Sequence, residues 1–124
     1  MKKISQLTTD EAIDVFCSIT PYINNIVSDE ELLNELKSGI NIKDTSTLAE
    51  KYVVIGEKLS SISEVLLKKR RNDVYGILSV FENKSIEEIS KQPFIKTMID
   101  IRTLLKDKEL VSFFMSCMDT EGGE

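Results

Sequence analysis

Hydrophobic residues recur every three or four positions along nearly the whole chain, and short polar stretches separate the runs. This spacing is the period of an amphipathic α-helix, whereas the alternation typical of strands is weak. Helix starts are predicted at Thr8, where acidic residues follow a hydroxyl, and at Ser28 and Ser85, where a glutamate three residues later completes a capping box. The pattern therefore predicts an all-α fold, with five to seven helices in one compact domain.

The longest regular run predicts a long central helix. Its apolar positions recur at spacings of four and three residues, which is the spacing of a heptad repeat. The basic run at residues 68–71 is expected to close this helix, because cations suit the negative end of the helix dipole. The apolar positions either pack inside their own monomer or join two subunits. These positions, called the heptad seam below, are Leu48, Tyr52, Ile55, Leu59, Ile62 and Leu66.

Other residues define the expected boundaries and core. Pro21 should kink or split the first helix, because proline has no amide proton to donate, and Gly76 should permit the close approach of a neighbouring helix. The helical domain is predicted to span residues 1–118. Residues 119–124 are predicted to form a flexible polar tail, because two glycines lose much entropy on ordering. The predicted core contains Phe16, Leu36, Leu59, Leu66, Ile77, Phe81, Ile99 and Leu105.

The composition removes several classes of enzyme chemistry. The 124 residues contain no histidine, which excludes His-activated nucleophiles and His-ligated metals. No paired-carboxylate site, glycine-rich phosphate loop or cofactor motif is found, so we expect no enzyme activity, no cofactor and no bound metal. Cys17 and Cys117 fall in apolar stripes, and we expect both to be buried thiols in a reducing cytoplasm.

The charge distribution argues against nucleic-acid binding. The net charge is −5, and residues 1–60 carry ten acidic and six basic side chains. Residues 68–71 are the alternative, a basic patch for nucleic acid, but no aromatic residue is interleaved with them. No stretch approaches the roughly 20 apolar residues of a membrane span. We therefore expect a cytoplasmic protein that functions by binding other proteins.

The order of the expected helices and the residues in several short stretches together form a pattern that can be compared with known protein families. The stretches are residues 3–5 and 9–12, Thr20-Pro21-Tyr22-Ile23, residues 29–33, residues 67–77, and residues 106–110 followed by Phe113 and Phe114. In these features the chain resembles the small tail assembly chaperones of long-tailed phages and prophages of low-GC Gram-positive bacteria. The shared features are packing and capping patterns that cover most of the chain and include no catalytic residue.

The resemblance implies a helical, non-enzymatic chaperone that binds the tape measure protein and the tail tube subunits during tail assembly. Such a factor works in the host cytoplasm and is absent from the mature virion. In that family the reading frame often slips near the 3′ end of the gene, and a Gly122-Gly123 codon pair fits such a slippage site. The alternatives are a small helical interaction protein or a DNA-binding regulator from another mobile element.

Two apolar stripes are richer than one buried face requires, and they form the candidate partner-binding surface. A small helical domain commonly buries spare apolar stripes by oligomerisation, so we also expect a homo-oligomer joined through the heptad seam. The candidate residues are Leu48, Tyr52, Ile55, Leu59 and Ile62 of the heptad seam, together with Phe113 and Phe114.

Overall fold

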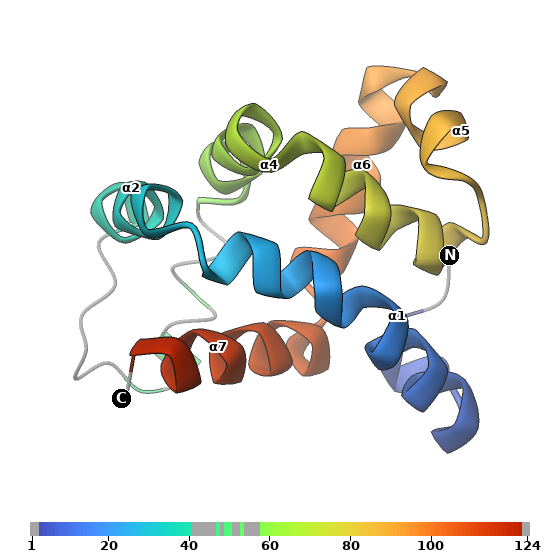
Figure 1. Ribbon diagram of the computed structural model, residues 1–124, viewed down its shortest axis with the longest axis horizontal. Coiled ribbons are helices and arrows are strands. Elements are labelled where there is room, and N and C mark those ends of the chain that lie inside the picture. The colour runs from blue at the N-terminus through green and yellow to red at the C-terminus, as the bar shows by residue number, and fades with distance from the viewer. Residues whose placement is uncertain (1–2, 41–46, 48, 51–52, 54–57, 123–124) are drawn as a thin grey trace.

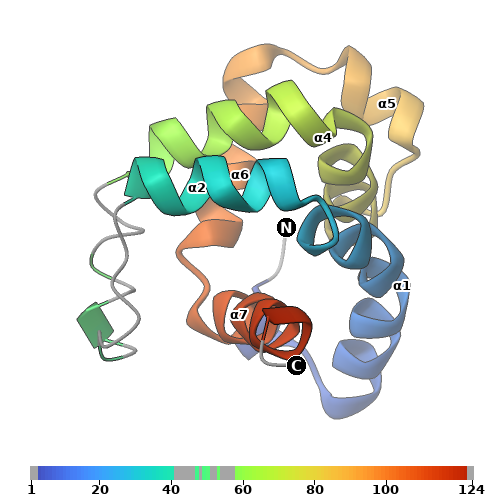
Figure 2. The ribbon, with the colours of Figure 1, turned by 60° about the vertical axis from the view of Figure 1, so that its left-hand side comes forward.

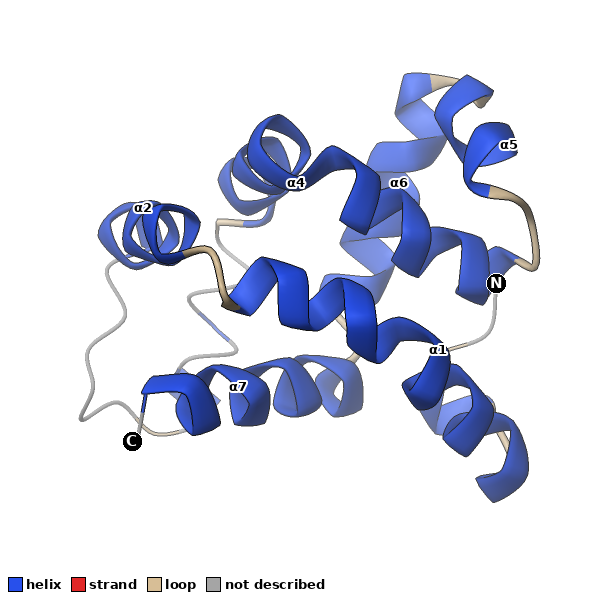
Figure 3. Ribbon diagram, viewed as in Figure 1, coloured by secondary structure: helices blue, strands red, loops and turns tan. Residues whose placement is uncertain are grey.

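The computed structural model describes residues 3–40, 47, 49–50, 53 and 58–122, and of residues 37–40, 59 and 117–122 it describes the backbone. Within these residues a 3-10 helix and six α-helices follow one another, and no strand is present (Figure 3). The predicted all-α fold with a long central helix is confirmed. The elements are η1 (Ile4–Gln6), α1 (Thr9–Val27), α2 (Glu30–Ile40), α4 (Leu59–Glu82), α5 (Ile86–Lys91), α6 (Phe94–Leu105) and α7 (Lys108–Gly122).

Helix α4 is the centre of the packing. It contacts α1, α2, α5 and α6, and α2 and α6 lie on opposite sides of it (Figures 1 and 2). Helix α7 completes the domain by packing against α1, α6 and η1. One apolar core joins all of these elements, so none of them is an independent unit. Its most buried apolar side chains are Ile19, Ile23, Ile26 and Val27 of α1, Leu32 of α2, Leu78 of α4 and Ile89 of α5.

The boundary predicted at residues 68–71 falls where two helical segments of α4 meet. Helix α4 runs from Leu59 to Glu82, but it is sharply kinked at Arg70, whose φ of −134° and ψ of 47° are not helical. The basic side chains are used across the helix interface. Lys69 Nζ lies 2.8 Å from Glu31 Oε1, and Arg70 Nε donates to Asp29 Oδ2 at 2.9 Å. These cations therefore tie α4 to α2 at the kink.

Local capping follows the sequence at two of the three predicted starts. At Thr8 and at Ser85 the hydroxyl accepts from the amide three residues later, and both capping boxes are complete. The start predicted at Ser28 is wrong, because Ser28 ends α1 and the Asp29 carboxylate caps α2 by accepting from the Leu32 amide at 3.0 Å. Pro21 does not split α1, which is continuous through it.

Gly76 permits the close approach that its position predicts. A Cβ atom built on Gly76 would collide with the aromatic ring of Tyr22, which α1 presses against α4 at this point. Atoms this close cannot coexist, so a larger residue requires α1 or the ring to move. The absence of a side chain at residue 76 sets how closely α1 and α4 pack.

A buried carboxylate joins the two ends of the described chain. Asp107 precedes α7 and caps it, because its Oδ1 accepts from the Glu109 amide at 3.1 Å and from the Leu110 amide at 3.4 Å. Its Oδ2 accepts from the Ile4 amide at 2.6 Å. Asp107 is only 4% exposed, so these hydrogen bonds are shielded from water. They fasten η1 to the start of α7.

The helical backbone of α7 extends past the predicted domain boundary. It runs to Gly122, beyond Met118, where the sequence predicts that the helix ends. The predicted flexibility of residues 119–124 and the product of frame slippage stay predictions.

Most of the predicted core residues face the interior. Leu36 and Leu66 are buried, and four others pack partly buried against the core: Phe16, Ile77, Phe81 and Leu105. The side chain of Leu59 lies outside the described residues.

Ile99 and Cys17 are corrections to the expected burial. Ile99 is 55% exposed, because α6 turns a different face to the core. Cys17 is exposed, since it lies on the outer side of α1, whereas Ile19 and Ile23 of the same helix are buried. The side chain of Cys117 lies outside the described residues.

Candidate partner-binding surface

Helix α6 buries polar residues on its inner side and exposes large apolar residues on its outer side. Its buried side includes the polar residues Thr97 and Asp100 beside Ile101 and Leu104. Its exposed side carries large apolar residues at exposures that are unusual for such side chains. Phe94 is 69% exposed, Ile95 is 70% exposed and Ile99 is 55% exposed. These three residues are called the α6 apolar face below.

A polar cluster between α4, α5 and α6 explains this orientation. Lys96 Nζ donates to Glu82 Oε1 and, at 3.0 Å, to Asp100 Oδ2. The side chain of Gln92 donates to Thr97 Oγ1 at 2.9 Å and to Asp100 Oδ2 at 3.4 Å. A buried polar group is costly without a partner, so turning Asp100 outward would abandon these hydrogen bonds. The cluster therefore holds Ile95 and Ile99 in solvent.

The charges in this cluster reinforce one another. The hydrogen bond to Glu82, and then the one to Asp100, raise the pKa of the Lys96 ammonium above 10.5. The side chains of Glu82 and Asp100 are 6% and 10% exposed, whereas that of Lys96 is 42% exposed. One partly exposed cation thus compensates two buried carboxylates, and it fixes α6 against the end of α4.

Two oxygens of the cluster are not satisfied. Within the described residues, Glu82 Oε2 and Gln92 Oε1 are buried without a hydrogen-bond partner. A buried acceptor in this condition costs about 1–3 kcal/mol. Both oxygens lie at the junction of α4, α5 and α6.

The residues that the sequence proposed for partner binding are only partly described. Leu48, Tyr52 and Ile55 lie outside the described residues, as does the side chain of Leu59. Ile62 is buried at 5% exposure, so in this chain it belongs to the core. Partner binding through the heptad seam stays a prediction.

The two aromatic candidates lie at the edge of the core. Phe113 and Phe114 are partly buried, and the ring of Phe113 lies 4.6 Å from that of Phe16 at an interplanar angle of 48°. Tilted rings at this separation attract one another. Phe113 therefore joins α7 to α1, and its ring is engaged within the domain.

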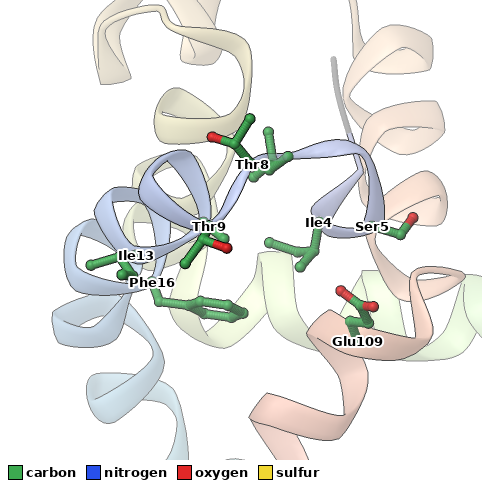
Figure 4. A pocket seen from close by; sticks show the side chains of 9 residues that line it. Ile4, Ser5, Thr8, Thr9, Ile13, Phe16 and Glu109 are labelled. Carbon is green, nitrogen blue, oxygen red and sulfur yellow. The ribbon is translucent and has the colours of Figure 1, made fainter.

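A shallow hollow of about 340 Å³ is lined in part by Phe16. Figure 4 shows Ile4 of η1 and the ring of Phe16 reaching toward it, with Glu109 of α7 at its other side. Ile13 of α1 also borders the hollow and is 54% exposed. The hollow brings together apolar, hydroxyl and carboxylate groups from three elements.

The run of four basic residues is partly neutralised. Lys69 Nζ lies 2.8 Å from Glu31 and 3.8 Å from Glu35, and the hydrogen bond that Lys69 donates to Glu31 raises the pKa of Lys69. Arg70 is held between Asp29 and Asp73. A phosphate backbone would have to compete with these carboxylates for both cations.

The sequence did not single out the α6 apolar face. Ile95 and Ile99 follow one stripe of α6, and Ile101 and Leu104 follow another, so the helical period alone fits either orientation. The orientation depends on Lys96, which binds Asp100 of its own helix and also Glu82 of α4. The contact with α4 is tertiary, so the periodicity of α6 does not reveal it.

Comparison of the sequence with models of protein families finds no match, and neither curated proteins nor solved structures give one. None of the helices in the described part of the chain is both long enough and apolar enough to cross a lipid bilayer. In the same residues, no three His, Cys, Asp or Glu side chains come close enough together to hold a metal ion. The assignment of function therefore depends on the surface itself.

Proposed function

We propose that this protein is a non-enzymatic binding protein whose α6 apolar face docks on a helical segment of another protein. The observation that carries the proposal is the exposure of Phe94, Ile95 and Ile99 on one helix whose buried side includes the polar residues Thr97 and Asp100. Large apolar side chains gathered on a surface mark interaction sites, and helix-to-helix docking uses residues spaced by three or four positions. Ile95 and Ile99 have that spacing.

The specific role that we propose is that of a phage tail assembly chaperone. It binds the tape measure protein and the tail tube subunits in the host cytoplasm and leaves before the virion is complete. Support comes from the resemblance of residues 3–12, 20–23, 29–33, 67–77 and 106–114 to that family. A tape measure protein is long and rich in helices, so it presents the kind of partner that a helical apolar face can take.

Co-expression with the tape measure protein and the tail tube protein encoded beside the gene tests this proposal. The wild-type protein should co-purify with at least one of them. The double variant Ile95→Ser/Ile99→Ser should reduce the capture at least about tenfold, because it removes the apolar contact but leaves the core intact. Ile13→Ser is the control, since Ile13 is as exposed as Ile99, at 54% against 55%, but lies on α1.

Three results would contradict the proposal. The first is that neither neighbouring protein co-purifies, and the second is that the double variant captures as much partner as the wild type. The third is that the control variant loses as much capture as the double variant. A mobility-shift titration at physiological salt examines the rival role of a DNA-binding regulator, and specific duplex binding there would favour that rival.

A further inference from the structure

The exposed stripe of α6 continues beyond its apolar part as positive charge. Ile95, Ile99, Arg102 and Lys106 follow one another at spacings of four, three and four residues, and all four are exposed. Lys106 is the C-cap of α6 and keeps right-handed helical torsions, with φ of −87° and ψ of −11°. Residues at this spacing share one helix face. The face is therefore apolar in its first half and cationic in its second half.

Arg102 and Lys106 are available to a partner. Among the described residues neither forms an ion pair, whereas Lys69, Arg70, Lys91 and Lys96 each do. Both cations also suit the negative end of the α6 dipole, which gives them a modest local role. That local role does not account for their alignment with Ile95 and Ile99.

We propose that the α6 face binds an acidic amphipathic helix. This inference rests on the proposed function and deepens it by naming the chemistry of the partner. The apolar stripe of such a helix covers Ile95 and Ile99, and its acidic side chains, one to two turns further along, pair with Arg102 and Lys106. The span from Ile95 to Lys106 is about 16 Å along the helix, so three turns of partner helix suffice.

Charge selects this occupant over a second copy of the chain. The exposed face of α6 carries Arg102 and Lys106, and Asp100, the acidic residue of this helix, is buried, so pairing the face with a second copy brings like charges together. A cationic stripe on an acidic protein attracts an acidic segment and also orients it, because the apolar and charged halves must both be matched. If the acidic side chains lay at the other end of the partner helix, they would face Ile95 and Ile99 and would leave Arg102 and Lys106 unpaired.

A displayed library of helical peptides tests the proposal. Each peptide has about five turns, leucine at helical spacing along one stripe, and Glu, Lys or Gln at random in the positions that flank it. The library is selected on the wild-type protein, on Arg102→Glu/Lys106→Glu, and on Ile95→Ser/Ile99→Ser. Circular dichroism confirms that each variant is folded, and Arg102→Gln/Lys106→Gln replaces the charge-reversed variant if that variant unfolds.

The expected result is a reversal of preference. Peptides rich in glutamate should be enriched in selection on the wild type, and peptides rich in lysine in selection on the charge-reversed variant. If the glutamine variant is used instead, its selected peptides should show no charge preference. The best glutamate peptide should bind the wild type roughly tenfold more tightly than its lysine counterpart, and the difference should shrink at high salt. Neither peptide should bind the Ile95→Ser/Ile99→Ser variant.

The other outcomes overturn the proposal in distinguishable ways. Peptides that need Ile95 and Ile99 but show no preference for glutamate would overturn the acidic partner and leave the proposed function standing. Peptides that bind the Ile95→Ser/Ile99→Ser variant as well as the wild type would remove the α6 face from both proposals. A wild-type dimer that this double variant converts to monomer, seen by sedimentation, would show that a second copy is the occupant.

Discussion

At the scale of single residues, Lys96 determines how α6 is oriented. It bridges Glu82 and Asp100, which are largely buried and would otherwise face one another without a cation. Replacing a buried charge pair by one unpaired charge is more harmful than removing an exposed pair. The polar cluster is therefore sensitive to this one side chain.

Lys96→Met should lower the free energy of unfolding by about 1–2 kcal/mol, which lies between the cost of losing an exposed pair and that of breaking a buried pair because Lys96 is partly exposed. Lys91→Met is the matched control, since the ion pair between Lys91 and Glu87 is fully at the surface. It should change the free energy by less than about 0.5 kcal/mol. Urea titration measures both. Equal losses in the two variants would show that the cluster does not stabilise the fold.

Asp29 makes the stability depend on pH in the acidic range. The hydrogen bond from the Leu32 amide, and then the Arg70 guanidinium, hold the pKa of Asp29 below 3.8. Its contribution is therefore fully present above pH 3.8 and is lost as the pH falls through the lower folded pKa. Asp29→Asn keeps a capping side chain but cannot be ionised. The stability advantage of the wild type over this variant should shrink from pH 5 to pH 2 on urea titration, and an advantage that is constant with pH would contradict the assignment.

At the scale of elements, the orientation of α6 buries one isoleucine and exposes another two positions away. Ile101 is 4% exposed, whereas Ile99 on the same helix is 55% exposed. Ile101→Ala should cost about 2–5 kcal/mol, and Ile99→Ala should change the free energy of unfolding by less than about 0.5 kcal/mol. Urea titration of the pair is the measurement. A larger loss in Ile99→Ala than in Ile101→Ala would mean that α6 is turned the other way.

The elements also show what the sequence could and could not predict. The caps at Thr8 and Ser85 depend on residues three positions away, so local chemistry was sufficient to find them. The packing of α4 against α2 and the orientation of α6 depend on partners in other helices. Arg70 pairs with Asp29, 41 positions away, and Lys96 pairs with Glu82, 14 positions away. The fold class therefore followed from periodicity, but the candidate surface required the tertiary contacts.

At the scale of the whole molecule, Asp107 connects η1 to α7. Asp107→Asn keeps the oxygen that caps α7, but its amide group would direct a donor at the amide of Ile4. Losing this buried hydrogen bond should cost about 1–2 kcal/mol. Thermal unfolding followed by circular dichroism measures the loss. An unchanged midpoint would mean that η1 contributes nothing to the stability of the domain.

The hydrogen bond from the Ile4 amide to Asp107 should form late in folding. The two residues are 103 positions apart, so the bond closes a loop that contains most of the chain. Closing so long a loop carries a large entropy cost, which is met only after the intervening helices have docked. The bond should thus form after the rate-limiting step. In stopped-flow experiments Asp107→Asn should accelerate unfolding and leave the refolding rate nearly unchanged.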